Sequence, residues 1–155
     1  MTTKAHSHPA SAIAQRLRTA EQLCAQRGSR LTPLRRQVLE TLLQHPGSLK
    51  AYELLDALRT AQRGAAPPTV YRALDFLTAQ GLIHRLDAIN AWTACTDAGG
   101  QPHDLLIVCT RCGNVAELSD PALSRRLADC VAQAGFVLDG RETELRAVCT
   151  RCQQG

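Results

Sequence analysis

The chain has 155 residues, seven cysteines and a formal net charge of +4. This length suits one ordinary domain or two small ones. No N-terminal apolar run resembles a signal peptide, and no stretch is long enough to cross a bilayer, so we expect a cytoplasmic protein without a membrane partner. Seven cysteines cannot all pair within one chain, and thiols that stay reduced in the cytoplasm are available to bind metal.

The charge is unevenly distributed along the chain. Residues 1–95 carry twelve Lys and Arg against six Asp and Glu, whereas residues 96–155 carry six against eight. A basic first half indicates a contact with nucleic acid. The alternative is that these side chains belong only to solvated helix faces.

Apolar residues at helical spacing predict four helices in the first half. They cover about 11–26, 33–44, 50–62 and a fourth segment from Thr69 to the Gln80-Gly81 pair. Thr32 followed by Pro33 is a typical helix start. Pro67 and Pro68 predict a stiff approach to the fourth helix with Thr69 as its N-cap, and the expected buried stripe consists of Val70, Leu74 and Leu77.

Two short strands are predicted over 82–86 and 91–95. Helices, a short helix-to-helix turn and then a β-hairpin are the element order of a winged helix-turn-helix. Two adjacent glycines within 97–102 predict a linker. We therefore expect an α+β protein with a winged-helix DNA-binding domain over 1–95 and a second, small α/β domain over 96–155.

The second half predicts strands over 105–108, 114–118 and 144–148, and a helix from the Asp120-Pro121 pair to about residue 134. The Asp139-Gly140 pair predicts a hairpin that leads into the last strand. Cys24 and Cys130 fall within predicted helices and are expected to be core thiols.

Two Cys-x-x-Cys pairs, Cys109 with Cys112 and Cys149 with Cys152, are separated by 36 residues. Four thiolates in two matched pairs favour a closed tetrahedral zinc site of the structural kind. The intervening segment can hold a helix and a strand, so the metal would join distant parts of one domain. Two disulfides or unligated thiols are the alternative.

The fourth helix carries the candidate DNA contacts. Arg72 suits a bidentate contact with guanine, while Tyr71 can pack on a thymine methyl group or donate to a phosphate. The hydroxyl of Thr69 and the N–H groups of the helix start suit a phosphate. We expect further phosphate contacts from Arg30, Arg35 and Arg36. The alternative is again an ordinary solvated helix face.

The segment Pro-Pro-Thr-Val-Tyr-Arg-Ala-Leu-Asp-Phe-Leu at 67–77, followed by Gly-Leu-Ile-His at 81–84, resembles the DNA-reading segment of the ferric uptake regulator family. Leu-Thr-Pro-Leu-Arg at 31–35 and the paired Cys-x-x-Cys motifs are similar to other parts of that family. The resemblance covers about residues 12–152 and is nearest to the zinc-dependent repressors of zinc uptake. It implies a homodimer that binds an AT-rich palindrome in double-stranded DNA when its sensing site is filled.

Four further residues are candidate ligands of a sensing zinc. A wing hairpin centred between Ile89 and Asn90 would place His84 opposite Cys95, about 5 Å apart. A hairpin closed by the first Cys-x-x-Cys would place His103 opposite Leu118, beside Glu117. The set His84, Cys95, His103 and Glu117 offers two nitrogens, one sulfur and one oxygen. These positions match the sensing ligands of zinc uptake regulators, so we expect two zinc sites per chain, one structural and one regulatory.

A metal with ligands from both domains would fix their relative angle and, in a dimer, the distance between the two DNA-reading helices. An iron- or peroxide-sensing regulator of the same family is the alternative function. Such sensors favour histidine and carboxylate ligands, whereas the Cys95 thiolate favours zinc. A zinc hydrolase would need an open metal position and a general base, and the sequence contains no HExxH motif. We therefore expect neither an enzyme nor a small-molecule substrate.

Overall fold

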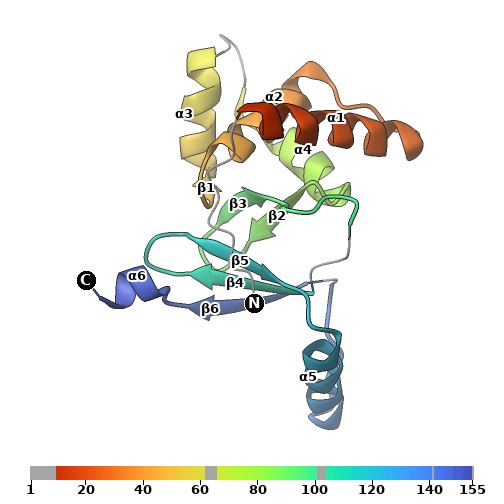
Figure 1. The fold of residues 1–155 in the computed structure, drawn as a ribbon, viewed down its shortest axis with the longest axis vertical. Coiled ribbons are helices and arrows are strands. Elements are labelled where there is room, and N and C mark those ends of the chain that lie inside the picture. Colours follow the sequence, from red (N-terminus) through yellow and green to blue (C-terminus); the bar gives the residue numbers. More distant parts are fainter. Residues whose placement is uncertain (1–9, 62–65, 101–103, 141, 155) are drawn as a thin grey trace.

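The computed structural model describes residues 10–61, 66–100, 104–140 and 142–154, and it contains two small sheets with helices around them (Figure 1). The elements of the first half are α1 (Ala10–Gln26), α2 (Pro33–Gln44), β1 (Leu49–Lys50), α3 (Ala51–Ala61), α4 (Pro67–Ala79), β2 (Ile83–Leu86) and β3 (Ala91–Ala94). This order confirms the predicted winged helix-turn-helix and adds the short strand β1.

The predicted helix stripes form the core of the first half. Leu54, Leu58, Leu74 and Leu77 are all fully buried in one apolar cluster that also contains Trp92 of the wing. Burying a leucine side chain stabilises the fold by about 1.5–3 kcal/mol. The cluster therefore fixes α4 against the wing and holds its outer face toward solvent.

The two predicted helix starts had different outcomes. Thr32 caps α2 as expected, because its side chain accepts a hydrogen bond from the Arg35 backbone N–H. The predicted cap at Thr69 is wrong, since α4 begins at Pro67 with Ala66 as its N-cap. Proline fits the first helical turn because its φ is already helical and it has no N–H to leave unsatisfied.

This start also removes the predicted anion site at the beginning of α4. Pro67 and Pro68 offer no N–H groups, and the N–H groups of Thr69 and Val70 donate to the carbonyl oxygen of Ala66 at 3.0 and 3.2 Å. A phosphate contact at Thr69 would therefore have to use its exposed side chain.

The wing sheet has the strand order β1-β3-β2. Its register pairs His84 with Thr93, so the prediction that His84 faces Cys95 was wrong by two residues. The cause is the four-residue loop 87–90, in which Asn90 takes a left-handed φ of 49°. A slip of two residues keeps every side chain on the same face of the sheet, so Cys95 remains diagonal to His84.

The second half contains β4 (Leu105–Cys109), β5 (Val115–Leu118), α5 (Pro121–Gln133), β6 (Thr143–Ala147) and α6 (Thr150–Gln153). Its sheet has the order β5-β4-β6, with β6 parallel to β4. Leu105, not His103, lies opposite Leu118, because the Cys109 N–H donates to the Asn114 oxygen and closes a four-residue loop. The predicted hairpin at Asp139-Gly140 is also wrong, since described residues 134–140 contain no strand.

Helix α5 extends away from the rest of the chain (Figure 1) and none of its residues is fully buried. Cys130 on this helix is exposed rather than a core thiol, whereas Cys24 is buried as expected. Large apolar side chains are also exposed on α5, on the segment that follows it and on β6, namely Leu123, Phe136, Val137, Leu138 and Leu145. These side chains leave an apolar surface on the single chain.

The wing packs directly on the second sheet. Leu86 and Ile89 of the wing contact an apolar cluster formed by Leu106, Val108 and Val115. Polar contacts surround this cluster: the Ser48 hydroxyl donates to the Gly113 oxygen at 2.8 Å, and Glu144 accepts from the backbone of the wing loop. Gly113 has a φ of 72°, and a side chain there would collide with the Ser48 oxygen. Among the described helices, none is long and apolar enough to cross a membrane.

Candidate metal centres and nucleic-acid interface

The two Cys-x-x-Cys pairs come together at one end of the second sheet. Cys109 ends β4, Cys112 lies in the following turn, Cys149 is the N-cap of α6, and Cys152 lies within that helix. Their four sulfurs lie within 4.8 Å of one another, with 3.7 Å between those of Cys112 and Cys149. Zinc–sulfur bonds are about 2.3 Å long, so a tetrahedral ion fits this cluster.

Hydrogen bonds favour the thiolate forms that zinc requires at Cys109 and Cys112, whereas hydrogen bonds with Cys112 and Cys149 raise the pKa of Cys152 to about 12. The Cys149 N–H donates to Cys109 Sγ at 3.4 Å, and this backbone contact is the main cause that lowers the pKa of Cys109 to about 6. The backbone of Asn114 lowers the pKa of Cys112, and Arg151 Nη2 lies 3.8 Å from the Cys112 sulfur. The cluster therefore has the donor chemistry of a closed structural site.

A second cluster joins the wing to the second sheet. The ligand atoms of His84 on β2, Cys95 just after β3 and Glu117 on β5 lie within 4.8 Å of one another. His84 Nε2 is 3.2 Å from Glu117 Oε1, and both side chains are about 95% buried. Imidazole, thiolate and carboxylate are all zinc ligands. His103, the fourth predicted ligand, lies outside the described residues.

The pKa values of His84 and Glu117 show how this buried cluster balances its charges. Burial alone would lower the pKa of His84, but hydrogen bonds with Cys95, Glu117 and Glu142 outweigh it and raise this pKa to about 11. Burial raises the pKa of Glu117, but the contacts with His84 and Thr96 together outweigh it and leave the pKa below its ordinary value. Without metal, the imidazolium form of His84 therefore balances the anionic groups around it.

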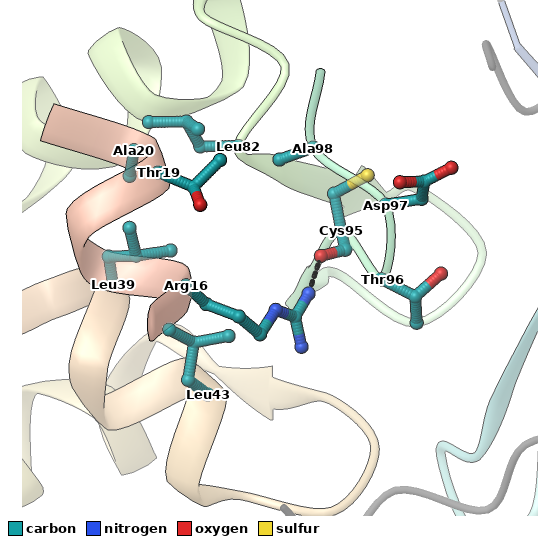
Figure 2. Close-up of a pocket in the computed structure, with 10 residues that line it drawn as sticks. All are labelled: Arg16, Thr19, Ala20, Leu39, Leu43, Leu82, Cys95, Thr96, Asp97 and Ala98. Carbon is teal, nitrogen blue, oxygen red and sulfur yellow. Dashed lines mark hydrogen bonds between the residues drawn. The ribbon is translucent and has the colours of Figure 1, made fainter. Parts of the chain in front are cut away.

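Neighbouring residues hold the ligands in place. The Thr96 N–H donates to Glu117 Oε1 at 3.0 Å, and its hydroxyl also donates to this carboxylate. Arg16 of α1 donates to the carbonyl oxygen of Cys95, and Figure 2 shows the Cys95 sulfur pointing away from that guanidinium. A cavity of about 180 Å³ lies beside this contact, between α1, α2 and the segment after β3. The main chain of Cys95 is thus anchored to α1 while its sulfur faces the cluster.

Helix α4 presents the candidate nucleic-acid surface. Tyr71 and Arg72 are exposed, as predicted. The Tyr71 ring meets Trp92 of the wing edge-on, with centroids 6.1 Å apart, and Arg85 lies over the same Trp92 ring at 5.8 Å. These contacts couple the exposed start of α4 to the wing.

The three other predicted arginines differ in their surroundings. Arg30 is exposed, and its carbonyl oxygen accepts from Arg35 Nη1 at 2.7 Å. The Arg35 guanidinium stacks over Phe76 at 3.5 Å, and Arg36 forms an ion pair with Glu21 of α1. Arg35 and Arg36 are therefore partly engaged within the protein, while Arg30 has its side chain toward solvent.

Comparison with known protein families gives one match that covers most of the chain. Residues 26–146 match the model of the ferric uptake regulator family. The chain belongs to the ferric uptake regulator family. Members of this family are transcription regulators and not enzymes, as the sequence predicted.

Individual relatives place the chain within this family. The zinc uptake regulation protein of Escherichia coli (strain K12) is 39% identical over 137 residues, which is 88% of this chain and 80% of the relative. The solved structure of a zinc uptake regulator complexed with zinc and DNA is 38% identical, with a TM-score of 0.81 over 92% of this chain and 95% of that one.

One family relative, XcZur, has been solved in two states. Its holo form gives a TM-score of 0.75 at 38% identity over 90% of this chain and 97% of the relative. Its apo form gives 0.54 at 36% identity over 92% and 99%. The overall structure of the present chain is therefore more similar to the holo form than to the apo form.

Sequence reasoning missed several residues at these sites. Glu142 lies 2.7 Å from His84 Nδ1, and Thr96 and Arg16 hold the residues around Glu117 and Cys95. None lies in a spacing motif, because each meets the site through tertiary structure. Arg85 carried a weaker signal, since it is the exposed residue among the buried residues of β2, whereas Trp92 is itself buried in β3.

Proposed function

We propose that this protein is a zinc-responsive repressor of zinc uptake genes, with zinc as its corepressor. The observation that carries this proposal is that His84 and Cys95 of the wing meet Glu117 of the second sheet in one buried cluster. We assign the sensing zinc to these three residues and to His103. A bound zinc ion would supply bonds that join the two domains, which we divide at residues 1–95 and 96–155.

The four cysteines have a different role in this proposal. All four belong to the second half, so a zinc ion held by Cys109, Cys112, Cys149 and Cys152 would fasten β4 to the C-terminal segment. Such a closed site contributes to folding rather than to sensing. Each chain would then carry one structural and one regulatory zinc.

The contacts between the wing and the second sheet support a sensor whose two domains close on each other. The wing lies against the second sheet through Leu86, Ile89 and Glu144, and this arrangement resembles the holo rather than the apo form of XcZur. Ligands contributed by both domains bind metal well only when the domains are closed. Zinc binding therefore favours the closed shape by differential affinity.

We further propose that the closed shape binds double-stranded DNA through α4. Tyr71, Arg72 and Thr69 are exposed on the first turns of this helix, where helix-turn-helix proteins contact base edges and phosphates. Arg30, Arg35 and Arg36 are assigned to the phosphate backbone. The zinc uptake regulator with a TM-score of 0.81 was solved in complex with DNA. An AT-rich palindrome is the operator that we assign to this chain.

A homodimer follows from the same proposal, because a palindrome presents two equal half-sites. The exposed apolar residues of α5, of the segment after it and of β6 provide a surface that a second copy would cover. In this dimer, the angle between the two domains sets the distance between the two α4 helices. We also propose that the protein works in the cytoplasm, where operator DNA is accessible.

An iron- or peroxide-sensing regulator is the second candidate, since ferric uptake regulation proteins are also relatives; that of Bordetella parapertussis is 34% identical over 73% of this chain. The buried Cys95 thiol at the interdomain cluster favours zinc, because soft thiolate ligands suit zinc better than hard carboxylate sites do.

A DNA-binding titration in chelator-buffered metal tests the proposed function. The purified dimer is mixed with labelled promoter fragments of zinc uptake genes while free zinc, ferrous iron or manganese is varied separately. We expect zinc to induce binding at much lower free concentration than the other two ions. Induction by iron at physiological free concentrations, with no response to zinc, would instead support the second candidate.

A further inference from the structure

A glutamate carboxylate lies close to each of the two nitrogen atoms of the His84 imidazole. Nε2 lies 3.2 Å from Glu117 Oε1, on the side of the interdomain cluster, and Nδ1 lies 2.7 Å from Glu142 Oε1. Glu142 comes from the segment between α5 and β6, and its side chain is 34% exposed, against 4% for His84. The second domain thus contacts this wing histidine from two separate segments.

The two nitrogens of an imidazole point in different directions and have different roles in metal sites. When one nitrogen binds the metal, the other usually donates its N–H to a carboxylate, a carbonyl oxygen or water, which fixes the tautomer and the ring orientation. Nε2 of His84 faces the carboxylate of Glu117 in the cluster that also contains Cys95. Nδ1 of the same ring faces Glu142.

We propose that Glu142 is a positioning residue for the sensing zinc. Its carboxylate accepts the Nδ1–H of His84, which holds the ring so that the Nε2 lone pair points at the metal position between Cys95 and Glu117. This inference rests on the zinc site proposed above. Glu142 does not itself bind the ion, because it contacts Nδ1, whereas the ligand Glu117 contacts Nε2.

This arrangement has a consequence for sensing. Glu142 can reach His84 only when the wing lies against the second sheet, as it does here. The hydrogen bond therefore orients the wing ligand only in the closed shape, and it increases the difference in zinc affinity between closed and open shapes. Loss of such an outer-shell partner typically lowers metal affinity about 10- to 100-fold.

Three variants of the full-length dimer test this role. Glu142→Gln keeps a side-chain oxygen that can accept the Nδ1–H but loses the charge, and Glu142→Ala loses both. Asp139→Asn is the matched control, since Asp139 is an exposed acidic residue lining the same open groove as Glu142 and His84. Zinc affinity of the second site is measured by chelator competition, and Co²⁺ absorption spectra report the ligand set.

We expect zinc affinity to fall about 10- to 100-fold in Glu142→Ala and less in Glu142→Gln, with Asp139→Asn like the wild type. The Co²⁺ bands should keep their positions and intensities in all three variants at saturating metal. Unchanged affinity in Glu142→Ala would overturn the inference. Equal losses of affinity in all three variants would also overturn it, because they would indicate a long-range charge effect. Altered Co²⁺ bands in Glu142→Gln would overturn it as well, because they would make Glu142 a ligand.

Cys95→Ser measured in the same series separates this inference from the proposed function. If Cys95→Ser still binds a second zinc, the proposed sensing site is wrong. If Cys95→Ser loses the second zinc while Glu142→Ala binds it normally, the site stands and only the role of Glu142 is refuted.

Discussion

His84 on β2 and Glu117 on β5 belong to different sheets, yet His84 Nε2 lies 3.2 Å from Glu117 Oε1 in a buried cluster. A contact of this kind exists only while the wing lies against the second sheet. Any ion that binds both residues stabilises that arrangement, and this relationship underlies the predictions below.

Replacing a ligand of the interdomain cluster should affect sensing but not folding. In Cys95→Ser, we expect one zinc per chain instead of two, an intact dimer and loss of zinc-dependent DNA binding. The expected loss is about 5- to 150-fold in affinity, the usual range of coupling between two sites. Metal analysis, size-exclusion chromatography and an operator titration measure these quantities. A variant that still needs zinc to bind DNA would refute the assignment of Cys95.

Replacing a ligand of the four-cysteine cluster should affect folding instead. Structural zinc contributes folding free energy directly, so Cys112→Ser should unfold the second domain or dissociate the dimer. Cys130→Ser is the matched control, because Cys130 is also exposed but lies outside the cluster. Thermal unfolding followed by circular dichroism checks the prediction. A well-folded dimeric Cys112→Ser protein with the melting temperature of the control would contradict it.

DNA specificity should depend on α4. Arg72→Ala should reduce operator affinity by roughly 1–3 kcal/mol and relax specificity at one base position. Arg30→Ala should weaken binding to all DNA sequences. It should also reduce the slope of log affinity against log salt concentration by about one. Arg125→Ala on α5 provides the control, since it removes one exposed positive charge from the other half of the chain. If Arg72→Ala matches this control, α4 is not the recognition helix.

Contacts that do not involve metal should also help to hold the wing against the second sheet. Glu144 accepts the backbone N–H groups of Asp87 and Ala88 at 2.8 Å each, which fastens β6 to the wing loop. Hydrogen bonds to a charged group contribute about 1.5–3 kcal/mol when buried and less at a partly exposed site. We expect Glu144→Ala to weaken zinc binding at the second site about tenfold, whereas Arg146→Ala on the same strand should not. Calorimetric zinc titration of both variants decides this.

Local sequence signals predicted the elements well. The Thr32-Pro33 start and the stripe of Val70, Leu74 and Leu77 depend on neighbours within one or two turns, and the structure confirms them. Thr69 was misplaced because a threonine after two prolines resembles an N-cap, whereas the prolines themselves form the first turn of α4.

Long-range relationships were harder to predict. Both hairpin registers were wrong by two residues, since register depends on loop length and each loop contains four residues. Side chains alternate with a period of two, so this error preserved the faces and the neighbourhood of His84, Cys95 and Glu117. Glu142 carried no local signal, because only the packing of its loop against the wing brings it to His84.

The most direct test of the central claim measures the distance between the two α4 helices of the dimer. A spin label is attached through a non-natural amino acid in place of Asp75, an exposed residue of α4, and pulsed electron paramagnetic resonance is recorded with the structural zinc retained. We predict that filling the second site narrows a broad distance distribution to one distance in the wild type but not in Cys95→Ser. Identical distributions with and without zinc in the wild type would contradict the account.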